Sequence, residues 1–156
     1  MVGRVRQVWF YLRPDLAGEA DRIAILNPAQ QALFRGLALQ DRAHALRVAG
    51  RLAGQDAPPY VIEAALLHDC GKPPEFTLVG RILGVLVGSW LDLPGQPAET
   101  GIRRQLQIYR WHDEWGLEAA QRAGTSDEAL ALLEAYQAKT PQPGWLGRLQ
   151  VADDLG

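Results

Sequence analysis

The sequence lacks the features that would place it outside the cytoplasm, in a membrane or on a nucleic-acid backbone. Its single cysteine, Cys70, cannot form an internal disulfide, which favours a reducing compartment. The longest apolar stretch, Ile82–Leu91, has about half of the roughly 20 residues that a membrane span requires, and we interpret it as a buried helix. With 16 basic and 18 acidic residues the formal net charge is −2, so there is no overall positive field for nucleic acid. These absences predict a cytoplasmic protein with neither a membrane nor a nucleic-acid partner.

Signals for β-strands are scarce as well. Alternating runs of Val, Ile and Thr are missing, whereas the helix-forming residues Ala, Leu, Arg, Glu and Gln dominate. The 156 residues, 47% of them hydrophobic, have the length of one domain and can build a core. We therefore predict an all-α fold, a single compact bundle of about six to eight helices over residues 1–156. Its core is expected over residues 28–155, with residues 1–27 as a helical extension.

Several helix ends follow from local residue chemistry. Asn27, Pro28 and Gln30 have the pattern of an N-cap, a first-turn proline and a reciprocal capping residue. The helical stretch that they open is expected to reach Arg51, with a break at Gly36.

The next predicted helix, YVIEAALLHDC (Tyr60–Cys70), follows the segment Asp56–Pro59. Apart from Glu63 it is apolar on nearly every side until His68, which is typical of a central, buried helix. Gly71 is expected to end this helix as its C-terminal cap.

The second half of the chain is expected to hold the remaining helices. Thr125 and Glu128 form a potential capping box for a helix that runs through Lys139, and Gly124 is expected to terminate the short helix before it. The other helices are predicted over residues 76–91, 98–111 and 145–155.

The most informative segment is ALLHDCGKP (Ala65–Pro73), where a buried helix delivers His68 and Asp69 side by side. Burying an ionised carboxylate is costly unless a cation or strong hydrogen bonds compensate it. A divalent metal would compensate Asp69, with neutral His68 as a second ligand, and the ammonium of Lys72 could hold a phosphate oxygen. The alternative is that His68 and Asp69 simply pair with each other or cap a helix end.

Two other predicted helices carry residues of the same type. His44 shares a stripe with Val48 and Leu52, since the three recur every four residues, and the final helix carries Asp153 and Asp154. Two histidines and two aspartates form a mixed nitrogen and oxygen site. Such a site suits one Mn, Fe, Co, Ni or Zn ion better than Mg.

His44, ALLHDCGK (Ala65–Lys72) and the terminal aspartates together resemble the H…HD…D signature of HD-domain phosphohydrolases, in particular their small stand-alone bacterial members. The resemblance covers about residues 28–155 and implies an HD-type helical domain. It implies one divalent metal held by His44, His68, Asp69 and Asp153. Asp153 is preferred to Asp154 because the last aspartate of the family follows a small residue in this way, although Asp154 stays an alternative.

Three further residues could contact either the substrate or one of the side chains predicted to hold the metal. His112 resembles the histidine that opens an HPxxG segment in two-metal family members, but Asp113 replaces the proline, and a later His-His pair is missing at residues 135–137. We therefore predict one metal, with His112 as a metal ligand kept as the alternative. Arg47 could reach a phosphate or be a solvated helix arginine, and Asp41 could fix the tautomer of His44.

These residues predict an enzyme that hydrolyses a phosphate mono- or diester of a small molecule, most plausibly a nucleotide. A metal-bound water would be the nucleophile, Asp69 would orient or deprotonate it, and Lys72 would stabilise phosphoryl charge. The alternative is a catalytically degenerate HD-domain module that binds a metal or nucleotide for regulation. Oxygenase chemistry at a di-iron centre would need more ligands than the sequence offers. The N-terminal segment VRQVWFYL (Val5–Leu12) could pack on the core or form a homodimer contact, with binding to a membrane surface as the less favoured alternative.

Overall fold

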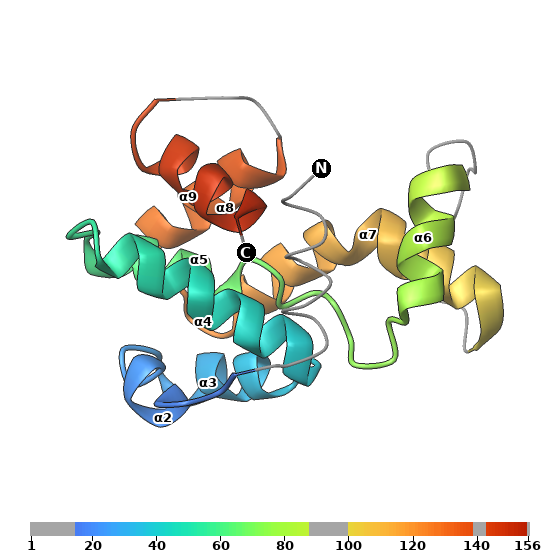
Figure 1. Cartoon of the computed structure of the whole chain (residues 1–156), viewed down its shortest axis with the longest axis horizontal. Helices are drawn as coiled ribbons and strands as arrows, with labels where there is room; N and C mark the ends of the chain where they lie inside the picture. The colour runs from blue at the N-terminus through green and yellow to red at the C-terminus, as the bar shows by residue number, and fades with distance from the viewer. Residues whose placement is uncertain (1–14, 88–99, 139–142, 156) are drawn as a thin grey trace.

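The computed structural model describes residues 15–87, 100–138 and 143–155, and within these ranges the chain is helical without a strand. This confirms the predicted all-α fold. The helices of the described residues are α2 (Glu19–Arg22), α3 (Pro28–Arg35), α4 (Leu39–Ala53), α5 (Pro59–Leu67), α6 (Leu78–Val87), α7 (Gly101–Arg122), α8 (Asp127–Gln137) and α9 (Trp145–Asp154) (Figure 1). None of these helices is both long enough and apolar enough to cross a membrane. The segment Val5–Leu12 lies outside the described residues.

Helix α3 begins as its local chemistry predicts. The side chain of Asn27 accepts a hydrogen bond from the Gln30 backbone, and the side chain of Gln30 accepts one from the Asn27 backbone. Pro28 occupies the first helical position, where its missing N–H costs nothing. The helix ends at Arg35 with Gly36 as its C-cap, so the predicted break before α4 is confirmed.

Helix α5 lies at the centre of the bundle and packs against α3, α4, α8 and α9 (Figure 1). Most of its apolar side chains are buried, as predicted, together with Val48 and Leu52 of α4, whereas Tyr60 and Ile62 are half-buried. The charged exception, Glu63, accepts hydrogen bonds from the side chain of Gln30 and from the backbone and hydroxyl of Ser126. Its carboxylate therefore ties α3 and α8 to the central helix.

The end of α5 differs from the prediction. The helix stops at Leu67, and His68–Gly71 form a turn in place of a further helical turn. The backbone φ of Gly71 is not positive, so it is not a left-handed cap. A Cβ at Gly71 would instead lie 1.8 Å from the backbone oxygen of His112 and 2.6 Å from the nitrogen of Gly116. Glycine is needed here because the turn touches the backbone of α7.

Helices α6 and α7 pack against each other and extend to one side of the bundle (Figure 1). Gly80 and Gly84 form the contact, since added Cβ atoms would lie 2.3 Å from the side chain of Gln105 and 2.2 Å from that of Tyr109. The opposite face of α6 is open, and Leu78, Val79, Ile82, Val85 and Leu86 are 53–69% exposed. The prediction of a buried helix over Ile82–Leu91 is therefore wrong for its described part, because only the glycine face packs. Residues 88–91 lie outside the described ranges.

Two other helix boundaries differ from the prediction, the end of α7 and the start of α8. The predicted end of a helix at Trp111 is wrong, because α7 continues to Arg122 and places His112 in mid-helix. Gly124, with φ 74°, follows its C-terminus as predicted. The cap of α8 is Ser126, whose hydroxyl accepts a hydrogen bond from the Ala129 backbone.

Thr125, which the sequence predicted as the N-cap of α8, instead contacts α3. Its hydroxyl accepts a hydrogen bond from the buried side chain of Gln30. The predicted end of α8 at Lys139 lies outside the described residues. The last helix, α9, ends one residue before the predicted boundary at Leu155.

Candidate metal centre

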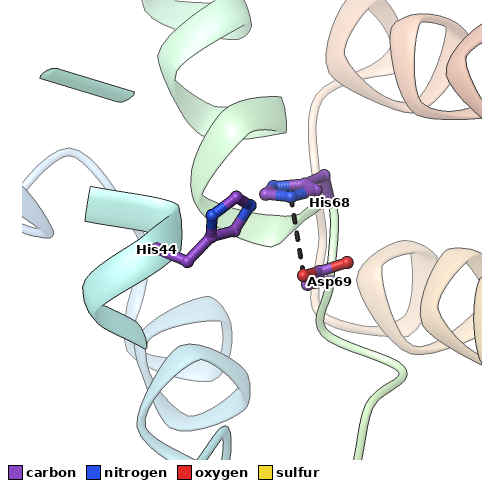
Figure 2. Close-up of side chains that lie close together, drawn as sticks. All are labelled: His44, His68 and Asp69. Carbon is purple, nitrogen blue, oxygen red and sulfur yellow. Dashed lines mark ion pairs between the residues drawn. The ribbon is translucent and has the colours of Figure 1, made fainter. Parts of the chain in front are cut away.

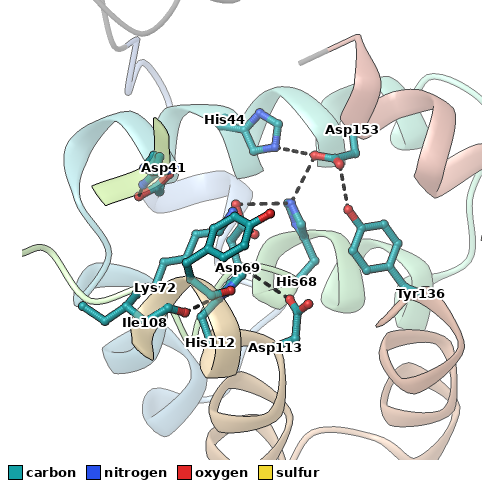
Figure 3. Close-up of polar contacts among 12 residues, drawn as sticks. Asp41, His44, His68, Asp69, Lys72, Ile108, His112, Asp113, Tyr136 and Asp153 are labelled. Atoms are coloured by element: carbon teal, nitrogen blue, oxygen red, sulfur yellow. Dashed lines mark hydrogen bonds and ion pairs between the residues drawn. The ribbon is translucent and has the colours of Figure 1, made fainter. Parts of the chain in front are cut away.

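Three segments distant in the sequence bring the predicted ligands together. His44 comes from α4, His68 and Asp69 from the turn after α5, and Asp153 from the last turn of α9 (Figure 3). One potential ligand atom each from His44, His68 and Asp69 lies within 4.8 Å of the others (Figure 2). Oδ1 of Asp153 lies 2.7 Å from Nε2 of His44 and 3.5 Å from Nε2 of His68. The fold therefore gathers all four side chains that the sequence singled out.

His68 presents one ring nitrogen to this group. Its Nδ1 lies 2.7 Å from the backbone oxygen of Ala65, and because a carbonyl can only accept, Nδ1 carries the donated hydrogen. Nε2 is buried and has no hydrogen-bond partner among the described residues. A buried polar atom left without a partner costs about 1–3 kcal/mol. Coordination of a cation would remove that cost.

The distances around Nε2 of His68 match the spacing of ligands around a metal. Oδ2 of Asp69 lies 3.6 Å away and Oδ1 of Asp153 lies 3.5 Å away, which is long for a hydrogen bond. Ligands about 2.0–2.2 Å from a tetrahedral metal are separated by roughly 3.4 Å. The shorter distance between His44 and Asp153 is a direct hydrogen bond, which would have to open for both to coordinate.

Each carboxylate is held from behind by a donor. Oδ1 of Asp69 pairs with the ammonium of Lys72 at 2.5 Å, which leaves Oδ2 toward His68. Oδ2 of Asp153 accepts a hydrogen bond of 2.6 Å from the hydroxyl of Tyr136, which leaves Oδ1 toward both histidines. Hydrogen bonds to the outer atoms of metal ligands fix their orientation in this way.

The charges of the four side chains favour a cation between them. Burial alone would raise the pKa of Asp69, but Lys72, His68 and His44 hold it well below its usual range. Burial likewise opposes the ionised form of Asp153, but the hydrogen bond from His44 and the close approach of His68 bring its pKa well below that of a free carboxyl group. Burial would lower the pKa of His68, but the Asp69 and Asp153 carboxylates outweigh it and raise the pKa to about 9. Two carboxylates thus face two histidine side chains, a donor set suited to a divalent transition metal once the metal displaces the proton from Nε2 of His68.

The structure separates the two terminal aspartates. Asp153 contacts His44 and His68, whereas Asp154, one residue further along α9, is exposed. Helical geometry turns successive side chains by about 100°, so only one of two neighbours can face the group. Asp153 is the neighbour that does so.

His112 lies beside the centre but is not one of the three converging groups (Figure 3). Its Nδ1 donates to the backbone oxygen of Ile108 at 2.9 Å, and its Nε2 lies 3.3 Å from Asp113. Burial, followed by the charge of Lys72, lowers the pKa of His112. The imidazole is therefore held neutral next to Lys72, and its predicted contact with substrate stays a prediction.

The polar residues on α4 have partners that the sequence did not indicate. Asp41 forms an ion pair with Arg81 of α6, whose Nη2 lies 2.7 Å from its Oδ2, and its role in fixing the tautomer of His44 stays a prediction. Arg51 donates to the backbone oxygens of Ala152 and Leu155, so it anchors the end of α9. Burial and then the charge of Arg51 lower the pKa of Arg47, whose phosphate contact stays a prediction.

Tyr136 is the site residue that the sequence did not reveal. Its position drew attention only because a His-His pair is missing there. Its hydroxyl reaches Asp153, and its ring meets the ring of His68 edge-on at 5.8 Å between centroids. No local pattern signals such a residue, because the contact depends on how α8 packs against α9.

Comparison with known proteins gives no relationship: no protein-family model, curated protein or solved structure matches this chain. The resemblance to HD-domain phosphohydrolases therefore stays a prediction from the residues that carry it.

Proposed function

We propose that this protein is a metal-dependent phosphohydrolase that cleaves a phosphate ester of a small molecule, with nucleotides as the preferred class of substrate. One divalent transition metal, Mn, Fe, Co, Ni or Zn, would be held by His44, His68, Asp69 and Asp153. HD-domain membership, suggested by the H…HD…D pattern, is part of this proposal.

The observation that carries the proposal is the buried Nε2 of His68. It faces two ionised carboxylates at distances that suit a shared metal and are too long for good hydrogen bonds. The surrounding protein orients each of the three groups by a contact on its far side. A simple ion pair between His68 and Asp69 would not require this convergence from three segments.

A metal held by these residues would supply positive charge that polarises a phosphoryl oxygen and lowers the pKa of water from 15.7 toward about 7. In this proposal Asp69, the second residue of the turn after α5, accepts the proton of the attacking water through one oxygen. The ammonium of Lys72, now on Oδ1 of Asp69, turns to a phosphate oxygen and stabilises its developing charge. Neutral His112 gives its Nδ1 hydrogen to the Ile108 backbone oxygen, so in this proposal its Nε2 accepts a hydrogen bond from the substrate beside Lys72.

The test compares neighbouring aspartates. The wild-type chain, Asp153→Asn and Asp154→Asn are purified without chelator, and their metal content is measured by elemental analysis. We expect about one metal per chain in the wild type and in Asp154→Asn, and at least about a tenfold loss of affinity in Asp153→Asn. Equal metal content in the two variants, or no metal bound by the wild type after titration with a divalent panel, would overturn the proposed site.

Catalysis is tested on the metal-loaded protein with phosphate monoesters, phosphate diesters and nucleotides. Lys72→Ala should keep the metal and lower kcat/KM by about 100-fold, which separates binding from chemistry. A chain that binds the metal but hydrolyses none of these substrates would point to the regulatory, non-catalytic alternative.

A further inference from the structure

Tyr136 links two of the four proposed ligands. It lies at the C-terminal end of α8, where its hydroxyl donates to Oδ2 of Asp153 at 2.6 Å. Its ring stands at 76° to the ring of His68, with the centroids 5.8 Å apart. One side chain thus fixes a carboxylate through a hydrogen bond and supports an imidazole through ring packing (Figure 3).

Asp153 is the proposed ligand that most needs such support. Its side chain is 28% exposed, whereas that of Asp69 is 9% exposed and that of His68 1%. Asp153 is also the next-to-last residue of α9, in a turn where helices fray. Water can compete for an exposed carboxylate, and rotation of its side chain would turn both oxygens away from His44 and His68.

The two carboxylates are held by donors of different charge. Lys72 brings an ammonium to Asp69, and a second cation on Asp153 would repel a divalent metal across the short distance to its inner oxygen. A tyrosine hydroxyl is neutral and offers a single hydrogen. It occupies Oδ2 of Asp153 without opposing the metal, and it directs Oδ1 inward as the one coordinating oxygen.

We propose that Tyr136 is a positioning residue of the metal centre, which makes Asp153 a ligand through one defined oxygen and thereby sets the affinity and coordination of the bound metal. This inference rests on the proposed metal site and goes beyond it in assigning a role to a residue that does not itself coordinate.

The test removes only the hydroxyl. Tyr136→Phe keeps the ring against His68, and Tyr60→Phe is the matched control because Tyr60 lies in the first turn of α5, about 12 Å of helix away from His68. The metal-free proteins are titrated with Co²⁺, and the dissociation constant and visible absorption spectrum of each complex are recorded. Circular dichroism and thermal unfolding without metal check that both variants fold.

We expect Tyr136→Phe to bind Co²⁺ about 10- to 100-fold more weakly than the wild type. Its Co²⁺ spectrum should also change in position and intensity, because a carboxylate free to use both oxygens alters the coordination number. A purely structural role would lower the unfolding temperature without changing that spectrum. Tyr60→Phe should match the wild type in both readouts.

Co²⁺ binding and phosphate-ester hydrolysis together distinguish a failure of the role of Tyr136 from a failure of the proposed function. If Tyr136→Phe binds Co²⁺ with the affinity and spectrum of the wild type, the role of Tyr136 is overturned while the metal site stands. If the wild type binds no Co²⁺, the metal site and the role of Tyr136 fail together. If Tyr136→Phe changes Co²⁺ binding as expected but the wild type hydrolyses no phosphate ester, the positioning role stands and only the proposed catalysis fails.

Discussion

Adjacent residues in the turn after α5 serve different purposes, because the turn directs their side chains to different neighbours. His68 and Asp69 face His44 and Asp153, whereas the thiol of Cys70 donates to the backbone oxygen of Gly116 in α7 at 3.2 Å. Burial, followed by the nearby Asp69 carboxylate, raises the pKa of Cys70 to about 12.

The raised pKa predicts an unreactive thiol. At pH 8 almost none of Cys70 is thiolate in the folded protein, whereas an unfolded thiol of pKa about 8.5 is partly ionised. Alkylation by iodoacetamide at pH 8 should therefore be at least about 100-fold slower in the native chain than in guanidinium. Both rates should rise with pH, since alkali favours the thiolate. A native rate close to the unfolded rate would show that Cys70 is accessible and its pKa ordinary.

The position of the turn His68–Gly71 relative to α7 depends on a contact between two glycines. Gly71 approaches His112 and Gly116 so closely that a Cβ would overlap backbone atoms of α7. A Cβ at Gly116 would in turn lie 2.9 Å from the nitrogen of Gly71. Backbone atoms cannot move aside as a flexible side chain can, so the turn and helix α7 hold each other in place.

Gly71→Ala is therefore expected to destabilise the metal-free protein by about 3 kcal/mol, because overpacking against backbone forces the turn and α7 apart. Gly50→Ala in α4 is the matched control, since a Cβ there meets nothing within 4 Å. That substitution should raise stability by about 0.5–1 kcal/mol through lower entropy of the unfolded chain. Urea unfolding of both variants measures whether each substitution lowers or raises the free energy of unfolding. Equal effects would mean that the turn does not require close contact with α7.

The proposed ligands also join parts of the molecule that are far apart in the sequence. His44 and Asp153 are 109 positions apart, and the turn after α5 lies between their helices. Arg51 adds a second tie by capping the last carbonyls of α9. A metal at this centre would bind the folded chain and not the unfolded one, because the unfolded chain does not gather the four groups.

Metal binding should therefore stabilise the whole fold. At a free Co²⁺ concentration about 100 times the dissociation constant, the gain is about 2.7 kcal/mol, or about 5–10 °C in Tm for a chain of this size. Differential scanning calorimetry with Co²⁺ and with EDTA measures this difference. His68→Ala should show no such rise. An equal rise in His68→Ala would indicate that the metal acts elsewhere on the protein.

Some features were determined by short stretches of sequence. The capping box of Asn27 and Gln30, the break at Gly36 and the buried position of α5 follow from bonds and apolar contacts within a few residues, and all three are confirmed. The His68-Asp69 pair was recognisable for a similar reason, because a carboxylate at the end of an apolar helix demands a partner.

Other features were decided only by tertiary structure. The open face of α6, the continuation of α7 through His112, the pairing of Asp41 with Arg81 and the contact of Tyr136 with Asp153 all depend on which helices meet. Alternative hydrogen-bond partners of a polar side chain differ little in free energy. The spacing of residues in the sequence does not determine which of these partners the side chain contacts. The sequence by itself therefore determined the helical class and the chemical types of the proposed ligands, whereas the packing of helices decided how each of these side chains is oriented and held.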